Sequence, residues 1–266
     1  MNALEFREVR FSHDARKTCL DQVSFALEEG CSSVLLGPNG AGKSTIMALA
    51  LGYLKPSGGE ILLFGKPLGS YNRKVLGSLV GYVSQSGGVS FNYSVIDYVL
   101  LGRASRISPL GTPGAADRKA AREAIETAGI GFLAERKVLE LSAGEMQMAS
   151  VARCLAQEPR LVLLDEPTSH LDPARTAGVA SLIRRLEESG MTVFFSTHDP
   201  HLARLCSRSA LLIRQGRILD RGASGEVLDR RRLESLYGTP FVEARAGEMD
   251  IPLPDFRFIR KEPGNQ

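Results

Sequence analysis

The sequence has no apolar stretch long enough to cross a lipid bilayer. Its longest nearly apolar stretch, Ile46 to Leu54, falls far short of the roughly 20 residues that a membrane-spanning helix needs. Residues 1–7 also lack the basic, apolar and small-residue pattern of a signal peptide. We therefore expect a soluble protein that stays in the cytoplasm.

The sequence also lacks a large excess of charge of either sign. Its 33 basic and 30 acidic residues leave a formal net charge of only +3. A dedicated nucleic-acid-binding protein usually carries a strong basic excess. We therefore expect no nucleic acid among its partners.

Paired cysteines are absent as well. The four cysteines lie far apart, and none belongs to a Cys-x-x-Cys pair of the kind that binds zinc or does redox chemistry. A cytoplasmic protein keeps its thiols reduced. We expect small core residues rather than metal ligands at Cys19, Cys31, Cys154 and Cys206.

The sequence does contain a regular alternation of strand-like and helix-like runs. Its 266 residues, 43% of them hydrophobic, can bury one substantial core with an inserted subdomain. Strand-type runs stand at residues 4–11, 20–36, 62–65, 79–83, 161–164 and 192–195. Helical spacing of apolar residues marks 121–128, 148–155 and 179–186, and residues 210–219 resemble a hairpin that turns at Gln215 and Gly216. This alternation favours an α/β fold with mainly parallel strands.

Residues 37–45 carry the pattern of a phosphate-binding loop. In such a loop, backbone N–H groups surround the phosphates, Lys43 supplies a positive charge and the Ser44 hydroxyl can hold Mg2+. A strand-like run precedes the loop and a helix-like run follows it, which is the context that the motif requires. A plain glycine turn is the weaker alternative, because motif and context agree. We predict a nucleoside triphosphate site formed by Gly37, Pro38, Asn39, Gly40, Ala41, Gly42, Lys43, Ser44 and Thr45.

The strand predicted at residues 161–164 ends in two carboxylates, Asp165 and Glu166. Ligands bind at the carboxyl edge of a parallel sheet, where this strand would end. In P-loop NTPases the aspartate at such a strand end holds Mg2+, so we assign this role to Asp165. Glu166 is then free to orient or deprotonate water. The alternative, that Glu166 only stabilises the first turn of a helix, fits less well beside a phosphate loop.

Residues 141–147, Leu-Ser-Ala-Gly-Glu-Met-Gln, open an amphipathic helix before this strand. On helix physics alone, Ser142 could cap the helix and Gly144 could admit a phosphate. The chain also has Gln85 after a predicted strand, Ser-His-Leu-Asp at 169–172 and His198 after another strand. In this order and spacing, these motifs resemble those of the ATPase subunits of ABC transporters. The resemblance covers residues 1 to about 238.

The resemblance implies a P-loop NTPase core with a mainly parallel sheet, an N-terminal antiparallel β region and an inserted helical subdomain. The ATPase domain would occupy residues 1–240, with its helical insert at about 86–160. Residues 241–266 would form a tail, which carries no usable motif.

The resemblance also implies roles for individual residues. Gln85 would sense Mg2+ and the attacking water, His198 would contact the γ-phosphate of ATP, and Asp172 would couple two sites. In this family two subunits meet head to tail. The segment from Ser142 to Gly144 of one subunit would then close over the ATP that Lys43 of the other holds, which makes the protein a homodimer.

Three positions depart from the family pattern. The family usually has a tyrosine near position 13 that stacks on adenine, and this chain offers the smaller ring of His13. Ala143 stands where a second glycine is commoner, which adds one methyl group near the γ-phosphate. Met148 replaces a common arginine, so any ion pair of that arginine is absent here.

Within the family, the segment ending in Gly102 and Arg103 and the late Leu-Tyr-Gly238 resemble the ATPases of importers for iron-siderophores, haem and cobalamin. This resemblance implies a membrane permease and an extracytoplasmic substrate-binding protein as partners. It also implies a peripheral location on the cytoplasmic side of the plasma membrane. Phe91, Tyr93 and Arg103 would lie against the permease, although the two aromatic residues could equally be local core under a loop.

Two other classes remain as alternatives. ABC ATPases without a transporter are disfavoured, because translation factors carry two cassettes and DNA-repair proteins insert a long coiled coil before the signature helix. This chain has one cassette and no heptads between Gln85 and Ser142. The ATPase of an exporter or of another importer has the same motifs, and the sequence does not separate it from a chelate importer.

Overall fold

The computed structural model describes residues 1–14, 17–85, 91–108, 111–169, 171–246, 249–255 and 257. A central sheet of six strands has the order β10-β9-β3-β8-β7-β6. Its strands are β3 (Ser32–Leu36), β6 (Val80–Val83), β7 (Leu161–Asp165), β8 (Thr192–Thr197), β9 (Ser209–Arg214) and β10 (Arg217–Ala223). All neighbouring pairs are parallel except the β9–β10 hairpin.

A second sheet is antiparallel and begins at the amino terminus. Its order is β2-β1-β4-β5. It contains β1 (Asn2–Asp14), β2 (Lys17–Glu28), β4 (Gly58–Leu63) and β5 (Lys66–Pro67). The predicted strand over 20–36 is therefore two strands, β2 and β3, which lie in different sheets. Gly30, with φ 77°, allows the chain to turn between them.

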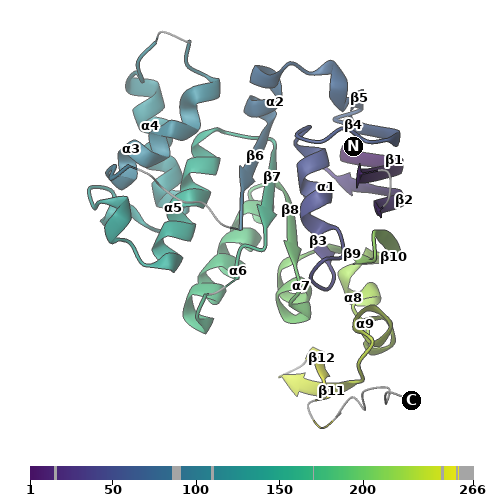
Figure 1. Cartoon of the computed structure of the whole chain (residues 1–266). Coiled ribbons are helices and arrows are strands. Elements are labelled where there is room, and N and C mark those ends of the chain that lie inside the picture. Colours follow the sequence, from purple (N-terminus) through teal and green to yellow (C-terminus); the bar gives the residue numbers. More distant parts are fainter. Residues whose placement is uncertain are drawn as a thin grey trace.

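Helices cover the parallel sheet and form a separate subdomain beside it. The α-helices are α1 (Lys43–Ala50), α2 (Arg73–Leu79), α3 (Val95–Leu100), α4 (Ala115–Thr127), α5 (Ala143–Ala156), α6 (Pro173–Glu188), α7 (Pro200–Cys206), α8 (Ser224–Val227) and α9 (Arg230–Tyr237). Short 3-10 turns are η1 (Leu68–Ser70), η2 (Leu101–Ser105), η3 (Gly131–Leu133) and η4 (Val138–Glu140). Helices α3, α4 and α5 gather on one side of the parallel sheet, and the antiparallel sheet lies on the other side (Figure 1). Among the described residues, no helix is long and apolar enough to cross a membrane.

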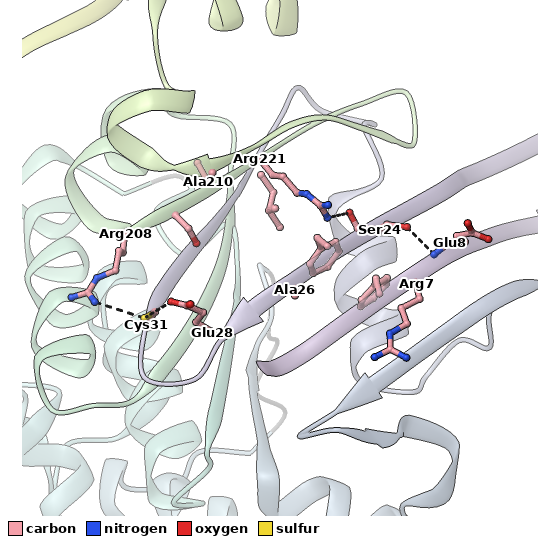
Figure 2. Close-up of a pocket in the computed structure, with 14 residues that line it drawn as sticks. Arg7, Glu8, Ser24, Ala26, Glu28, Cys31, Arg208, Ala210 and Arg221 are labelled. Carbon is pink, nitrogen blue, oxygen red and sulfur yellow. Dashed lines mark hydrogen bonds between the residues drawn. The ribbon is translucent and has the colours of Figure 1, made fainter. Parts of the chain in front are cut away.

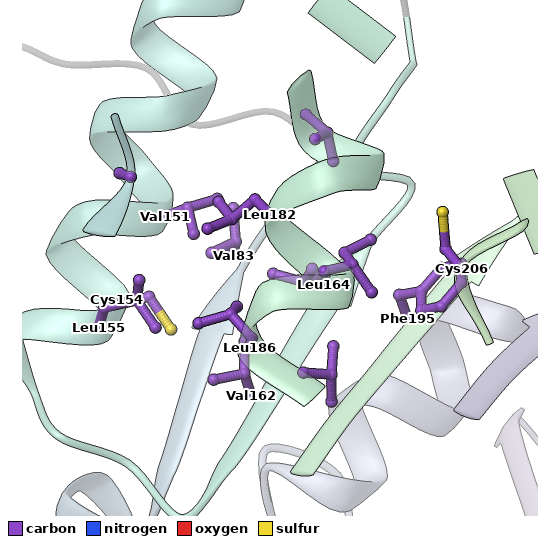
Figure 3. Packing of buried hydrophobic residues seen from close by; sticks show 14 of the residues in the cluster. Val83, Val151, Cys154, Leu155, Val162, Leu164, Leu182, Leu186, Phe195 and Cys206 are labelled. Carbon is purple, nitrogen blue, oxygen red and sulfur yellow. The ribbon is translucent and has the colours of Figure 1, made fainter. Parts of the chain in front are cut away.

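Both faces of the parallel sheet are buried, and successive residues of a strand face opposite layers. In β7, Val162 and Leu164 pack in one cluster with α5 and α6, as Figure 3 shows. Leu161 and Leu163 pack in the other cluster, with α1 and the antiparallel sheet. Because apolar contacts occupy both faces, polar side chains of the central strands can gather only at the strand ends.

The fold class predicted from the sequence is confirmed, including the antiparallel region and the helical insert. The hairpin at 210–219 also forms as expected, with its turn at Gln215 and Gly216. Beyond residue 240 the chain forms a further hairpin of β11 (Phe241–Ala246) and β12 (Met249–Pro254). Phe241 is 1% exposed and belongs to the main core.

Arg103 is not the surface residue that the sequence suggested. Its side chain is 9% exposed and forms ion pairs with Asp117 (2.9 Å) and Glu158 (2.8 Å). Its Nη1 also donates to the carbonyl oxygen of Ala156 at 2.8 Å. Neighbouring Gly102 permits this close packing, because a Cβ there would lie 2.0 Å from the carbonyl oxygen of Arg153. Arg103 therefore joins η2 to α4 and α5, and the expectation that it faces a permease is wrong. Phe91 is 67% exposed as expected, whereas Tyr93 is half-buried.

We predict that Arg103→Ala lowers the free energy of unfolding by about 2 kcal/mol. This is less than the roughly 3–5 kcal/mol for breaking a fully buried pair, because Glu158 stays half-exposed and can be solvated. Denaturant titration of the full chain measures it. Arg7→Ala, which breaks an ion pair of exposed side chains, is the control and should stay close to wild type. Equal stability of all three proteins would show that the Arg103 network is not structural.

Candidate nucleotide-binding site

A cavity of about 710 Å³ opens at the carboxyl edge of the parallel sheet. It is lined by Thr18, Cys19, Asn39, Gly40, Gly42, Lys43, Ser44, Thr45, Gln85, Glu166, Gln215 and Gly216. Four adjacent strands of the sheet end beside it. The phosphate loop follows β3, His198 follows β8, Glu166 follows β7 and Gln85 follows β6. The strand order therefore brings residues from distant parts of the sequence to one place.

The phosphate loop needs glycine at two positions for different reasons. A Cβ on Gly37 would lie 2.2 Å from the carbonyl oxygen of Ile213, so only glycine allows β9 to pass this close. Gly42 has φ 108°, a backbone conformation that favours glycine, and it immediately precedes α1. The loop thus leads directly into a helix amino terminus, where backbone N–H groups and the helix dipole favour a phosphate.

Lys43 and Glu166 form a buried ion pair in the cavity. Lys43 Nζ lies 3.0 Å from Glu166 Oε1, and the two side chains are only 6% and 7% exposed. Lys43 Nζ also donates to the carbonyl oxygens of Gly37 (2.7 Å) and Pro38 (3.2 Å). The lysine is therefore folded back on its own loop, and it balances the charge of the carboxylate.

Glu166 is held in place by its backbone as well as by its side chain. Its φ of 50° lies in the left-handed region, which is unusual for a residue with a side chain and is often found at functional sites. The Glu166 N–H donates to Ser196 Oγ (3.0 Å), and Ser196 Oγ in turn donates to Asp165 Oδ1 (2.5 Å). Ser196 is fully buried and links the two carboxylate residues. The sequence motif contained Ser196 but gave no reason to assign it this role.

His198 and Gln85 flank this pair. His198 Nδ1 lies 2.7 Å from Glu166 Oε2, and its ring is 53% exposed. A carboxylate only accepts hydrogen bonds, so Nδ1 carries the proton and Nε2 is left for another partner. Gln85 Nε2 donates to Ser169 Oγ at 3.5 Å. The structure thus brings Lys43, Glu166, His198 and Gln85 together, as the sequence predicted.

Ser142, Gly144 and Asp172 form a second, separate cluster. Ser142 caps α5 in a capping box with Glu145, and Asp172 caps α6 by accepting from the Arg175 N–H at 2.9 Å. The Arg175 side chain covers Gly144, where an added Cβ would lie 2.8 Å from its Cγ and Cδ. None of these residues lines the cavity. One chain therefore carries two partial sites.

The lining of the cavity differs from the sequence prediction at His13. His13 packs its ring edge against Phe11, 4.9 Å between ring centres, and is not among the lining residues. Thr18 and Cys19 of β2 line the cavity instead, together with Gln215 and Gly216 of the β9–β10 turn. Sequence reasoning missed these four, because only the folded chain brings them to the phosphate loop. Cys31, Cys154 and Cys206 are buried as expected, and burial raises the pKa of Cys154 to about 12. Cys19 is not a core residue as expected, because it is only half-buried and lines the cavity.

Oxygen donors at the site fit a hard cation. Ser44 and Gln85 line the cavity, and the Asp165 carboxylate lies at the adjoining strand end, 4% exposed. Burial, followed by the Asp165 charge, raises the pKa of Tyr82 to about 12, so this neighbour stays neutral. Hydroxyl, amide and carboxylate oxygens suit Mg2+. No three His, Cys, Asp or Glu residues in the described part of the chain could hold a metal by themselves. The donors therefore fit an ion that takes further ligands from phosphates and water.

A second cavity, of about 620 Å³, lies between β2 and the β9–β10 hairpin (Figure 2). Phe6, Phe25 and Leu211 supply apolar lining. The arginines there already have partners in the chain: Arg221 donates to the Ser24 carbonyl oxygen and Arg208 to Cys31 Sγ. No phosphate loop or catalytic carboxylate borders this cavity, so the nucleotide is assigned to the first one.

Comparison with known proteins agrees with this geometry. The sequence profile of the ABC transporter family matches residues 20–169, more than half of the chain. The chain belongs to the ABC transporter family. It is an ATP-binding cassette, the ATPase of the transporter, and cassettes of this family work with membrane permeases.

Several proteins resemble this cassette over most of its length. A hemin import ATP-binding protein of Bordetella avium is 38% identical, over 84% of this chain and 87% of its own. A molybdate import ATP-binding protein of Haemophilus influenzae is 34% identical, over 92% and 91%. An inward-facing ABC transporter described as of a metal-chelate type superimposes with a TM-score of 0.83. It is 32% identical, and the match covers 97% of this chain and 99% of that one.

We predict that Ser196→Ala in this cassette lowers the free energy of unfolding by about 1–3 kcal/mol, because it leaves a buried carboxylate and N–H without their shared partner. Its kcat should fall about tenfold, since Glu166 loses the hydrogen bond that fixes its backbone. Ser33→Ala is the matched control, because it removes another buried hydroxyl of the same sheet, 2.7 Å from Ser209 Oγ. This control should lose stability but keep its kcat. An unchanged kcat in Ser196→Ala would contradict the positioning role.

Proposed function

We propose that this cassette hydrolyses Mg-ATP to drive import of a metal chelate, of iron-siderophore, haem or cobalamin type, through a separate membrane permease. The observation that carries the ATPase part is the convergence of Lys43 and His198 on the two carboxylate oxygens of Glu166, beside the cavity. The cargo is supported by likeness to the hemin import proteins and to the metal-chelate type transporter, which match nearly the whole cassette. The subunit would sit on the cytoplasmic side of the plasma membrane and receive cargo indirectly from an extracytoplasmic binding protein.

In this proposal, ATP binding rearranges the buried ion pair. Phosphate oxygens replace the Gly37 and Pro38 carbonyls and the Glu166 carboxylate as partners of Lys43. Glu166 is then free to accept a proton from the attacking water, and His198 Nε2 turns to the γ-phosphate. Ser44, Gln85 and Asp165 would hold Mg2+, which supplies charge neutralisation on the phosphates when bound. Catalysis then depends mainly on positioning and charge stabilisation.

The proposed active form is a head-to-tail homodimer. The cavity has no cover from Ser142 or Gly144 of its own chain, which lie in the separate cluster with Asp172. A second copy can supply these residues, and Arg175 must then move off Gly144 to admit the phosphate. His13 is proposed to contact adenine beside Thr18, which is close to it at the β1–β2 hairpin end.

We predict that Glu166→Gln lowers the ATP hydrolysis rate by at least about 100-fold and leaves the ATP dissociation constant within about twofold. Lys43→Ala should instead weaken ATP binding by at least about tenfold, because it removes the cation that meets the phosphates. Phosphate release and equilibrium binding of labelled ATP measure the two effects.

In analytical ultracentrifugation, Glu166→Gln should sediment as a dimer with Mg-ATP and as a monomer without it.

Wild-type hydrolysis by Glu166→Gln would remove Glu166 from the role of base. A Glu166→Gln protein that binds Mg-ATP but stays monomeric, both alone and with its permease, would contradict the head-to-tail dimer.

We further predict that deleting this subunit, in a strain without a duplicate ATPase, abolishes uptake of one labelled chelate among ferric siderophore, haem and cobalamin.

Phe91→Glu should lower that uptake at least about tenfold and leave ATP binding unchanged, because a charge would enter the proposed permease contact. Leu219→Glu, at a comparably exposed apolar residue of β10, should leave uptake normal. Normal uptake of all three chelates in the deletion strain, or co-purification with an exporter's membrane domain, would refute the cargo assignment.

A further inference from the structure

The carboxy-terminal helix α9 contacts the loop that carries His198. The Tyr237 hydroxyl donates to the His198 carbonyl oxygen at 2.7 Å. Two other hydrogen bonds shape this loop: the Asp199 N–H donates to Thr197 Oγ1 (3.0 Å), and the His201 N–H donates to Asp199 Oδ1 (2.8 Å). The first of these bonds holds the N–H of the same peptide group whose carbonyl oxygen accepts from Tyr237. The peptide between His198 and Asp199 is therefore fixed on both sides, by Thr197 and by Tyr237.

Tyr237 is itself well fixed. Its ring centre lies 5.9 Å from that of Phe241, which is 1% exposed. Helix α9 ends at Gly238 in the left-handed conformation, φ 66°, which turns the chain so that Phe241 can pack beside Tyr237. Glu234 Oε1 accepts the Phe241 N–H at 3.0 Å and closes this turn.

The electrostatic surroundings keep Tyr237 a hydrogen-bond donor. Burial, and then the charges of Asp199 and Glu166, raise the pKa of Tyr237. The phenol therefore stays protonated across the physiological pH range.

Helix α9 is tied to the nucleotide cavity at a second place. Arg214, the last residue of β9, donates from Nη1 to the Ser235 carbonyl oxygen. The next two residues, Gln215 and Gly216, line the cavity. The Gly216 N–H donates to the Ala41 carbonyl oxygen of the phosphate loop at 3.0 Å. One short helix thus contacts both the His198 loop and the turn that supports the phosphate loop.

We propose that Tyr237 is a positioning residue for ATP hydrolysis, which holds the His198 peptide so that the imidazole meets Glu166 and the γ-phosphate together. Tyr237 is not among the residues that line the nucleotide cavity, and it acts only through His198. This inference rests on the proposed function, because it requires that His198 takes part in turnover.

The test compares two phenol-to-phenyl substitutions in the full chain. Tyr237→Phe should lower kcat about fivefold, which corresponds to about 1 kcal/mol, the net contribution of one hydrogen bond. The ATP KM should stay within about twofold, because the phosphate loop is untouched. Tyr71→Phe is the matched control: the Tyr71 hydroxyl also donates to a carbonyl oxygen, that of Leu63, at 2.7 Å. It lies in the turn after β5, and its loss should leave kcat unchanged.

A double-mutant cycle separates this inference from the proposed function. In the His198→Ala background, with residual hydrolysis followed by radiolabelled ATP, Tyr237→Phe should lower kcat no further. If His198→Ala retains wild-type turnover, the proposed role of His198 fails. If His198→Ala is impaired but Tyr237→Phe turns over like wild type, the role of Tyr237 alone is overturned. A fivefold loss that persists in the His198→Ala background, or equals that of Tyr71→Phe, also overturns it.

Discussion

The buried ion pair between Lys43 and Glu166 governs the rest of the nucleotide site. Removing two charges from water costs several kcal/mol for each, and their attraction offsets this only with good geometry and further hydrogen bonds. Here the pair is 3.0 Å apart, with two carbonyl oxygens on the lysine and an imidazole nitrogen on the carboxylate. Each partner neutralises the other without nucleotide. Under the proposed function, an incoming triphosphate would offer Lys43 stronger anions, and its binding would free the carboxylate to act on water.

The parallel sheet brings this pair together, but its strands supply only part of the expected site. Four adjacent strands end at one edge and deliver the phosphate loop, His198, Glu166 and Gln85 in spatial order. No strand of the same sheet delivers Ser142 or Gly144, which belong to the inserted subdomain and cluster with Asp172. Within one chain, the cluster of Ser142, Gly144 and Asp172 does not cover the cavity that holds Lys43 and Glu166. A second copy, related by a two-fold axis, would complete both sites at once, because each copy carries both halves.

Much of the site was predictable because its chemistry depends on local sequence. The phosphate loop must contain glycines, a lysine and a hydroxyl residue in fixed order, and the carboxylates must follow an apolar strand. Long-range packing was not predictable in this way. Thr18 and Gly216 reach the cavity only because β2 and the β9–β10 turn pack on the phosphate loop. The resemblance placed Arg103 against a permease, but its charge is met by Asp117 and Glu158, which lie further along the chain. The break between β2 and β3 was missed because strand-type runs stand on both sides of Gly30.

The carboxy-terminal region also makes long-range contacts that no sequence motif predicted. Residues 237–241 carry no motif with a chemical meaning, yet Tyr237 meets the His198 loop and Phe241 fills part of the main core. Core packing and catalytic geometry are coupled there, because the turn that buries Phe241 also orients the Tyr237 ring. A change in this segment would therefore reach His198, which is proposed to contact the γ-phosphate, from outside the nucleotide cavity. The segment is an integral part of the fold, since Phe241 lies in the main core and Tyr237 donates to the loop that carries His198.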